Sequence, residues 1–371
     1  MKINELITSI FCLIVVFILI SIPHTNYILK PRLYDGTINE LGRYSFTFDA
    51  YQHIKTESEN SVIALGSSKM REIFNGVAIQ NHSNTDTEFF NLGYAGERNY
   101  VRMIETDAII ALQPNLVLLE VGPNSFSKLS DPVPQNVAAQ MIQLMALNPY
   151  WLTQSWSEEI TELDQTILPM TRVEQLSFYT DISNQAVEAS IRYTIGESDQ
   201  PYTCDALIGN VRCVPMPQTK EYHEYLKYPP QFQNLLEKIK LGQHKWSIEE
   251  FYGERLDNYV NSSYHNPEGQ VNKNQRALEF MIESFLASGI EVMLVGLPYN
   301  PVLLDRLQEG QWDYYNSTLM EYSSKYNISI VDYLWSDFWV EEDFNDYTHA
   351  AKSGEEKFAE LITPEIIKIM D

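Results

Sequence analysis

The chain has 371 residues, with 50 acidic against 26 basic side chains and a formal net charge of −24 at pH 7. So acidic a protein repels polyanions, which excludes nucleic acid as a partner and favours neutral or cationic substrates. A hydrophobic content of 44% is enough to bury a large core, and no low-complexity run marks a disordered tail.

An uncharged apolar stretch runs from Leu6 to Pro23. At about 1.5 Å per residue it just reaches across a hydrocarbon core of roughly 30 Å. It lacks the small-residue cleavage pattern of a signal peptide, so a retained transmembrane helix is expected. Basic residues flank it on both sides and leave its orientation open. We therefore predict a membrane anchor in residues 1–30 and one enzyme-sized domain in residues 31–371.

The positions of the cysteines bear on which side of the membrane the enzyme-sized domain lies. Cys12 lies in the apolar stretch, which leaves Cys204 and Cys213 nine positions apart. Either they form a short disulfide loop, as in an oxidising compartment, or they are two unpaired thiols. Glycosylation sequons are compatible with export and begin at Asn81, Asn261, Asn316 and Asn327. We expect a single-pass cell-membrane protein with an extracytoplasmic domain.

Short apolar runs alternate with segments of helical spacing along this domain. In chain order, the sequence predicts a strand at Ser61–Leu65, a helix at Lys69–Phe74, a strand at Glu88–Leu92, a helix at Tyr100–Leu112, a strand at Leu116–Val121, an insertion at about 126–274, a helix at Gln275–Ala287, strands at Glu291–Val295 and Ile328–Asp332, and a helix from Gly354 to about Ile362 that Pro364 interrupts.

This alternation predicts an α/β fold, a three-layer α/β/α sandwich around a mainly parallel five-stranded sheet. Ligands of such sheets bind beyond the carboxyl ends of the strands. Ser68, Gly96 and Asn124 each follow a predicted strand. We therefore expect them to meet at one edge of the sheet.

The chain resembles the SGNH hydrolase superfamily, also called the GDSL family, in four short blocks. These are Gly66-Ser67-Ser68, Asn91 to Glu97, Gly122-Pro123-Asn124-Ser125, and Asp346-Tyr347-Thr348-His349. The resemblance implies a flavodoxin-like SGNH hydrolase fold and a Ser-His-Asp triad. The chain departs from the family at Ser67 and Ser125, where the family commonly has Asp.

The expected chemistry also follows from the residue types. The Ser68 hydroxyl is a weak nucleophile that needs a base, and His349 would be that base. Asp346 stands three residues earlier, which on one helical turn would place its carboxylate beside the imidazole. The three residues are our candidates for a catalytic triad.

An oxyanion needs donors that are already in place. The resemblance implies the backbone N–H groups of Ser68 and Gly96 and the side-chain amide of Asn124. We choose Gly96 over Gly93 because Gly96 precedes an acidic residue, as the family's glycine usually precedes an acidic or polar one, and Gly93 simply ends a strand.

Each residue has a plainer explanation on its own. Ser68 could be a helix cap, Asn124 a turn residue and His349 an ordinary surface or core histidine. Only their joint pattern is specific. Metal-binding and nucleotide-binding motifs are absent from the sequence, so neither a metal nor a cofactor is predicted.

The function predicted is a serine esterase or acyltransferase that acts on O-acyl groups, with O-acetyl favoured, of a cell-surface glycan or a small ester. A membrane acyltransferase would be a natural partner for such an anchored enzyme. The alternative is a catalytically inactive SGNH-like module that binds glycan or a partner in a surface assembly. Aromatic residues of the insertion could stack on sugars or form its own core: Tyr150, Trp151, Trp156, Tyr222, Tyr225, Tyr228 and Trp246.

Overall fold

The computed structural model describes residues 7–15, 41–94, 96, 98–126, 133–148, 154–171, 173–175, 177, 222–229, 257, 260, 272–310 and 312–370. Residues 7–15 are helical, but the rest of the predicted membrane span lies outside these ranges. Among the described residues, no helix is long and apolar enough to cross a membrane. Cys204 and Cys213 also lie outside the described residues, so the disulfide stays a prediction.

Five strands form one sheet in the order β2-β1-β3-β4-β5, and every neighbouring pair is parallel. The strands are β1 Ser61–Leu65, β2 Glu88–Asn91, β3 Leu116–Val121, β4 Glu291–Gly296 and β5 Ser329–Asp332. All five predicted strands are confirmed to within one residue at each end. The chain reverses its direction across the sheet between β1 and β3, and ligands of such sheets bind at that point.

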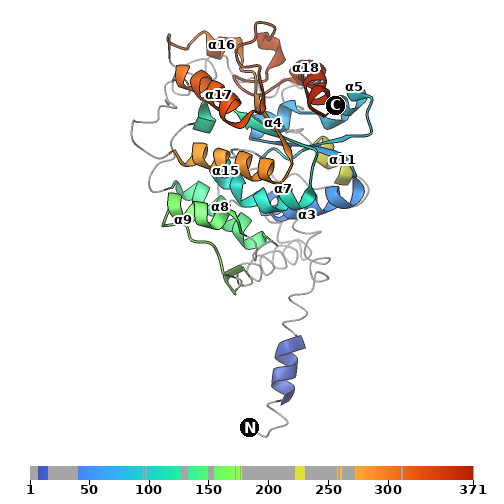
Figure 1. Ribbon diagram of the computed structural model, residues 1–371, viewed down its shortest axis with the longest axis vertical. Coiled ribbons are helices and arrows are strands. Elements are labelled where there is room, and N and C mark those ends of the chain that lie inside the picture. Colours follow the sequence, from blue (N-terminus) through green and yellow to red (C-terminus); the bar gives the residue numbers. More distant parts are fainter. Residues whose placement is uncertain are drawn as a thin grey trace, which may run out of the picture.

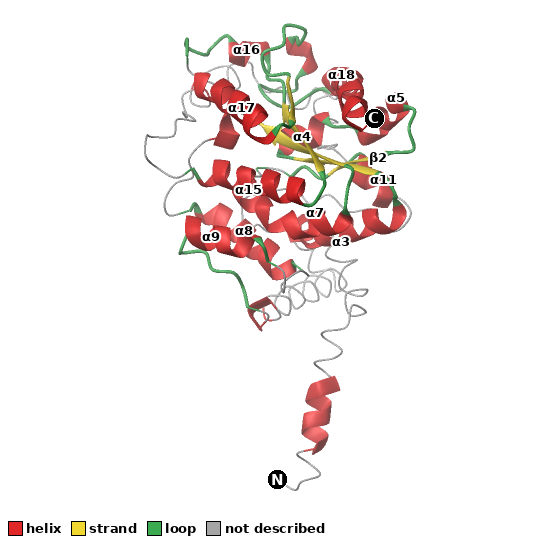
Figure 2. Cartoon of the chain, in the orientation of Figure 1, coloured by secondary structure: helices red, strands yellow, loops and turns green. Residues whose placement is uncertain are grey.

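Helices cover both faces of the sheet, as Figure 2 shows. On one face lie α4 Ser68–Ile73, α5 Gly76–Ser83 and α18 Lys352–Met370. On the other lie α3 Leu41–Glu57, α7 Thr106–Leu112, α15 Lys273–Ala287 and α17 Asp313–Tyr326. Alternate residues of β1 enter the two cores, Val62 and Ala64 on the first face and Ile63 and Leu65 on the second. The predicted three-layer sandwich is therefore confirmed.

Part of the predicted insertion adds helices outside the second face (Figure 1). These are α8 Gln135–Leu147 and α9 Trp156–Leu163, while α11 Tyr222–Lys227 packs at the β2 edge. The Trp156 side chain is fully buried in the core. This ring is therefore a core residue and is not available for stacking on a sugar.

Two predicted helices differ in the structure. The segment predicted as one helix from Tyr100 is divided into α6 Asn99–Arg102, a 3-10 turn η1 Met103–Glu105, and α7. The expected break at Pro364 is wrong, because α18 continues to Met370. Proline removes one backbone donor, but Ile362 and Ile366 on either side are buried in the same core, and this burial outweighs the lost bond.

Candidate active site

The turn after β1 positions two adjacent serines differently. Ser67 caps α4, and its hydroxyl accepts a hydrogen bond from the backbone N–H of Lys69 at 3.2 Å. Ser68 begins the helix, and its Oγ lies 2.8 Å from Nε2 of His349. The capping role considered for Ser68 thus belongs to Ser67, and the Ser68 hydroxyl meets an imidazole at the carboxyl end of β1.

The Asp346–His349 segment holds the imidazole from the other side. Oδ2 of Asp346 lies 2.6 Å from Nδ1 of His349, and Oδ1 accepts the backbone N–H groups of Thr348 and His349 at 2.7 and 2.8 Å. The expected helical turn is wrong, because this segment is a loop in which Asn345 N donates to the His349 carbonyl at 2.8 Å. The three-residue spacing works because the carboxylate caps its own loop.

The charges around the imidazole keep it basic. Burial alone would lower the pKa of His349, but the negative charge and hydrogen bond of Asp346 outweigh burial and raise this pKa above its ordinary value of 6.5. Glu72 adds to the rise, and Arg71 opposes it. Burial likewise works to raise the pKa of Asp346, but His349 and the backbone donors hold it below its ordinary value. The pair therefore favours a carboxylate beside an imidazole that readily accepts a proton.

Glu72 gives a test of this electrostatic arrangement. Ester hydrolysis should fall as pH drops through the raised pKa of His349, because a protonated imidazole cannot accept the Ser68 proton. Glu72→Gln removes a negative charge that raises this pKa, so the acidic limb of the kcat/KM profile should move to lower pH by about a few tenths of a unit. Glu360→Gln, on the exposed side of α18, is the control and should not move it. A shift to higher pH in Glu72→Gln would contradict the arrangement.

The predicted oxyanion residues lie along the same edge. Gly96 lines the cavity beside Ser68 and has a φ of +68°, whereas Gly93 packs against α4, where a Cβ would come within 2.7 Å of Arg71 N. A Cβ on Gly96 would meet nothing within 4 Å, so its left-handed backbone, not crowding, requires glycine. The backbone of Asn124 lies in the 3-10 turn η2 Pro123–Phe126, and its side chain is outside the described part of the chain.

Sequence reasoning missed a buried carboxylate under the turn Gly66–Ser68, called the nucleophile turn because it carries the predicted nucleophile Ser68. Glu120, near the end of β3, accepts the Ser67 backbone N–H at 2.6 Å and its hydroxyl at 2.9 Å. It also pairs with the Lys69 ammonium at 3.0 Å. Gly66 has no side chain because a Cβ there would lie 2.5 Å from Glu120 Oε2. An acidic group thus reaches this turn from β3, although the position before Ser68 holds serine.

One signal for Glu120 was present in the sequence, since it is the sole charged residue of the predicted strand Leu116–Val121. An ionised side chain in a buried strand needs a partner. The partner is Lys69 on α4, which lies 51 residues earlier in the chain. The apolar pattern of the strand contains no information about a residue at that distance.

A second series of contacts joins the nucleophile turn to the loop Asp346–His349, called the acid–base loop because it carries the predicted base His349. Lys69 Nζ donates to the Tyr299 hydroxyl at 2.9 Å, just after β4. The next residue, Asn300, donates its backbone N–H to the Tyr347 carbonyl at 3.0 Å and its side-chain amide to the Asp346 carbonyl at 3.2 Å. Residues from three strand ends therefore fix the relative position of Ser68 and His349.

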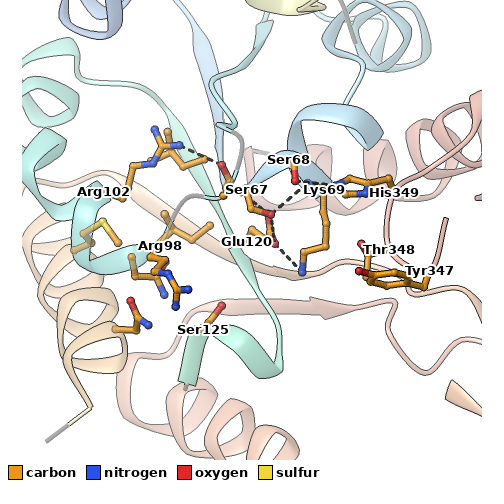
Figure 3. A pocket seen from close by; sticks show the side chains of 17 residues that line it. Ser67, Ser68, Lys69, Arg98, Arg102, Glu120, Ser125, Tyr347, Thr348 and His349 are labelled. Carbon is orange, nitrogen blue, oxygen red and sulfur yellow. Dashed lines mark hydrogen bonds and ion pairs between the residues drawn. The ribbon is translucent and has the colours of Figure 1, made fainter. Parts of the chain in front are cut away.

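A cavity of about 270 Å³ opens beside Ser68 (Figure 3). It is lined by Leu65, Gly66, Ser67, Ser68, Lys69, Gly96, Arg98, Asn99, Arg102, Leu119, Glu120, Ser125, Asn274, Met281, Tyr347, Thr348 and His349. Of the described residues in the predicted insertion, Asn274 alone lines it. The described residues that line the cavity thus come mainly from the carboxyl edge of the sheet.

Comparisons with known proteins give only distant likenesses. No protein-family model matches the chain, and neither does any curated protein. Among solved structures, the chain is similar to a provisionally named lipolytic protein of the G-D-S-L family from Desulfitobacterium hafniense DCB-2, with 12% identity and a TM-score of 0.35 over 82% of this chain and 99% of that one. It is also similar to a provisionally named acylhydrolase from Bacteroides fragilis NCTC 9343, with 12% identity and a TM-score of 0.38 over 88% of this chain and 98% of that one.

Proposed function

We propose that this protein is a serine hydrolase of the SGNH type. The observation that carries the proposal is the hydrogen-bonded series from Ser68 Oγ to His349 Nε2 and from His349 Nδ1 to Asp346 Oδ2, at 2.8 and 2.6 Å. This is the arrangement of nucleophile, general base and orienting carboxylate that acyl transfer requires.

In the proposed reaction, His349 takes the Ser68 proton as Oγ bonds to the acyl carbon of the ester. The ester C–O bond then breaks, His349 returns the proton to the leaving alcohol, and the acyl group stays on Ser68. A water or a second hydroxyl then takes the acyl group in the same way, giving a free acid or a new ester. Asp346 stabilises the imidazolium in both steps without itself taking the proton.

The acyl oxygen gains negative charge while the tetrahedral intermediate exists. We assign its donors to the backbone N–H groups of Ser68 and Gly96 and the side-chain amide of Asn124. What supports this assignment is the position of Ser68 and Gly96 on the wall of one cavity. The left-handed backbone of Gly96 turns the chain there without a side chain over the reacting centre.

The substrate we propose is an O-acyl ester, with O-acetyl favoured, of a cell-surface glycan or a small ester, met by a membrane-anchored enzyme. Water and sugar hydroxyls both accept an acyl group from the same intermediate, so the proposal covers esterase and acyltransferase activity. The small size of the cavity and its many polar groups support a short acyl group. The apolar N-terminal sequence supports the anchor.

Labelling by a fluorophosphonate tests the proposal because this reagent reacts with an activated serine hydroxyl. The full-length protein should be labelled at Ser68, and Ser68→Ala should abolish labelling. Ser67→Ala is the matched control, since the Ser67 hydroxyl faces Glu120 instead of an imidazole, and it should retain the label. Absence of labelling in the wild type, or a label carried by Ser67, would overturn the assignment.

A further inference from the structure

The cavity carries positive charge on a strongly acidic protein. Among the described residues, Lys69, Arg98 and Arg102 line it together with the carboxylate of Glu120, whereas the whole chain has a net charge of −24. The field that a substrate meets in a cleft depends on the charges that line it more than on the net charge. We therefore consider an anionic substrate, although the net charge by itself favours neutral or cationic ones.

Two of the three cations serve the fold. Arg102 is 2% exposed and is held by Glu105 at 2.9 Å and by the carbonyls of Leu92 and Gly66 at 2.8 and 3.3 Å. Lys69 is also buried and pairs with Glu120.

Arg98 differs from these two in exposure and position. Its side chain is exposed, and it precedes α6 on the segment that also brings Gly96 to the cavity. Figure 3 shows Arg98 among the side chains that line this cavity, together with Ser125 and His349. A guanidinium on this wall is available to a substrate that occupies the cavity.

We propose that Arg98 binds a carboxylate on the substrate, so that the natural substrate is an O-acyl ester of an acidic sugar or of another hydroxy acid. This inference rests on the proposed hydrolase function. The planar guanidinium can donate two parallel hydrogen bonds to a carboxylate, which fixes the ester as well as attracting it. The side chains of Asn99, Ser125 and Asn274 on the same wall can bind hydroxyl groups of such a substrate.

The lining also argues against a long lipid chain as the bound group. Its aliphatic members are Leu65, Leu119 and Met281, and all three are almost completely buried. A lipid would need a continuous apolar surface to gain free energy on binding. Among the described lining residues, amides, hydroxyls and a guanidinium interrupt any such surface.

The test compares two esters of the same shape, 4-acetoxybenzoate and 4-acetoxybenzamide, which differ in charge at one end. Hydrolysis of the first by water gives acetate and 4-hydroxybenzoate. The measured quantity is the ratio of kcat/KM for the carboxylate over the amide. Arg98→Gln should lower this ratio about tenfold, which corresponds to one charge-assisted hydrogen-bonded contact, and Arg98→Glu should lower it further. High salt should lower the wild-type ratio.

Arg306→Gln is the matched control, because Arg306 is 46% exposed but does not line the cavity. It should leave the ratio unchanged. An equal ratio in wild type and Arg98→Gln would overturn the inference while hydrolysis itself still supports the proposed function.

Failure of the wild type to hydrolyse either ester would count against the proposed function instead. Calorimetric titration with 4-hydroxybenzoate and 4-hydroxybenzamide then decides the inference without turnover. Preferential binding of the carboxylate that is lost in Arg98→Gln supports it, and equal binding of both compounds to the wild type overturns it.

Discussion

Ser68→Ala is expected to lower kcat for p-nitrophenyl acetate by about a thousandfold or more, because it removes the atom to which the acyl group is transferred. His349→Ala should cost a similar factor, because the Ser68 hydroxyl then has no base at 2.8 Å. The measurement is steady-state hydrolysis by the purified full-length protein, with unfolding by urea followed in parallel to show that both variants are folded.

Combining the two substitutions tests whether Ser68 and His349 act as one catalytic unit or contribute independently. Residues that act as a unit have effects far from additive, so Ser68→Ala/His349→Ala should be about as slow as either single variant. His82→Ala, an exposed histidine on α5, is the control and should keep wild-type activity. Activity of Ser68→Ala within about tenfold of the wild type would exclude Ser68 as the nucleophile.

Glu120→Ala is expected to lower the free energy of unfolding by about 3–5 kcal/mol, the usual cost of leaving one charge of a buried pair without its partner. The side chains of Lys69 and Glu120 are 9% and 8% exposed, so water replaces little of the lost interaction. The Ser67 backbone N–H also loses its acceptor. Urea denaturation measures the stability, and p-nitrophenyl acetate hydrolysis measures the effect on the nucleophile turn.

Lys69→Met/Glu120→Ala tests the reason for this loss. Removing both charges should restore much of the stability, whereas hydrolysis should stay low because the Ser67 N–H still lacks its acceptor. Glu224→Ala is the control, since its carboxylate is 62% exposed and lies 3.5 Å from Lys227, a long contact with water access that is worth less than about 1 kcal/mol. A loss below about 1 kcal/mol in Glu120→Ala would show that the pair is not a stabilising feature.

The strands were the most predictable part of the fold. Runs such as Leu116–Val121 are apolar except for Glu120 and are buried along their whole length, because helices cover both faces of the sheet, and this pattern is visible in the sequence. Helix boundaries were less predictable. The break at η1 Met103–Glu105 and the continuity of α18 through Pro364 depend on packing against neighbours, which outweighs local preference.

The candidate site was also only partly predictable from the sequence. Ser68, Asp346 and His349 could be chosen from short blocks because each block carries its own chemistry, and the structure brings the three together by hydrogen bonds. The reason given for the Asp346 spacing was nevertheless wrong, because the carboxylate caps a loop there and not a helix. A distance of three residues is compatible with both conformations.

The sequence by itself determined the strand positions, their alternation with helices and the residue types available for acyl transfer, since each of these follows from local periodicity and from side-chain chemistry. Only the tertiary structure decided that Glu120 supports the nucleophile turn, that Asn300 holds the acid–base loop, and that Arg98 lines the cavity. These contacts join residues far apart in the chain at the ends of parallel strands. The net charge and the spacing of residues along the chain do not report such contacts. Binding and catalysis, however, depend on the few groups that folding places within a few ångströms of one another.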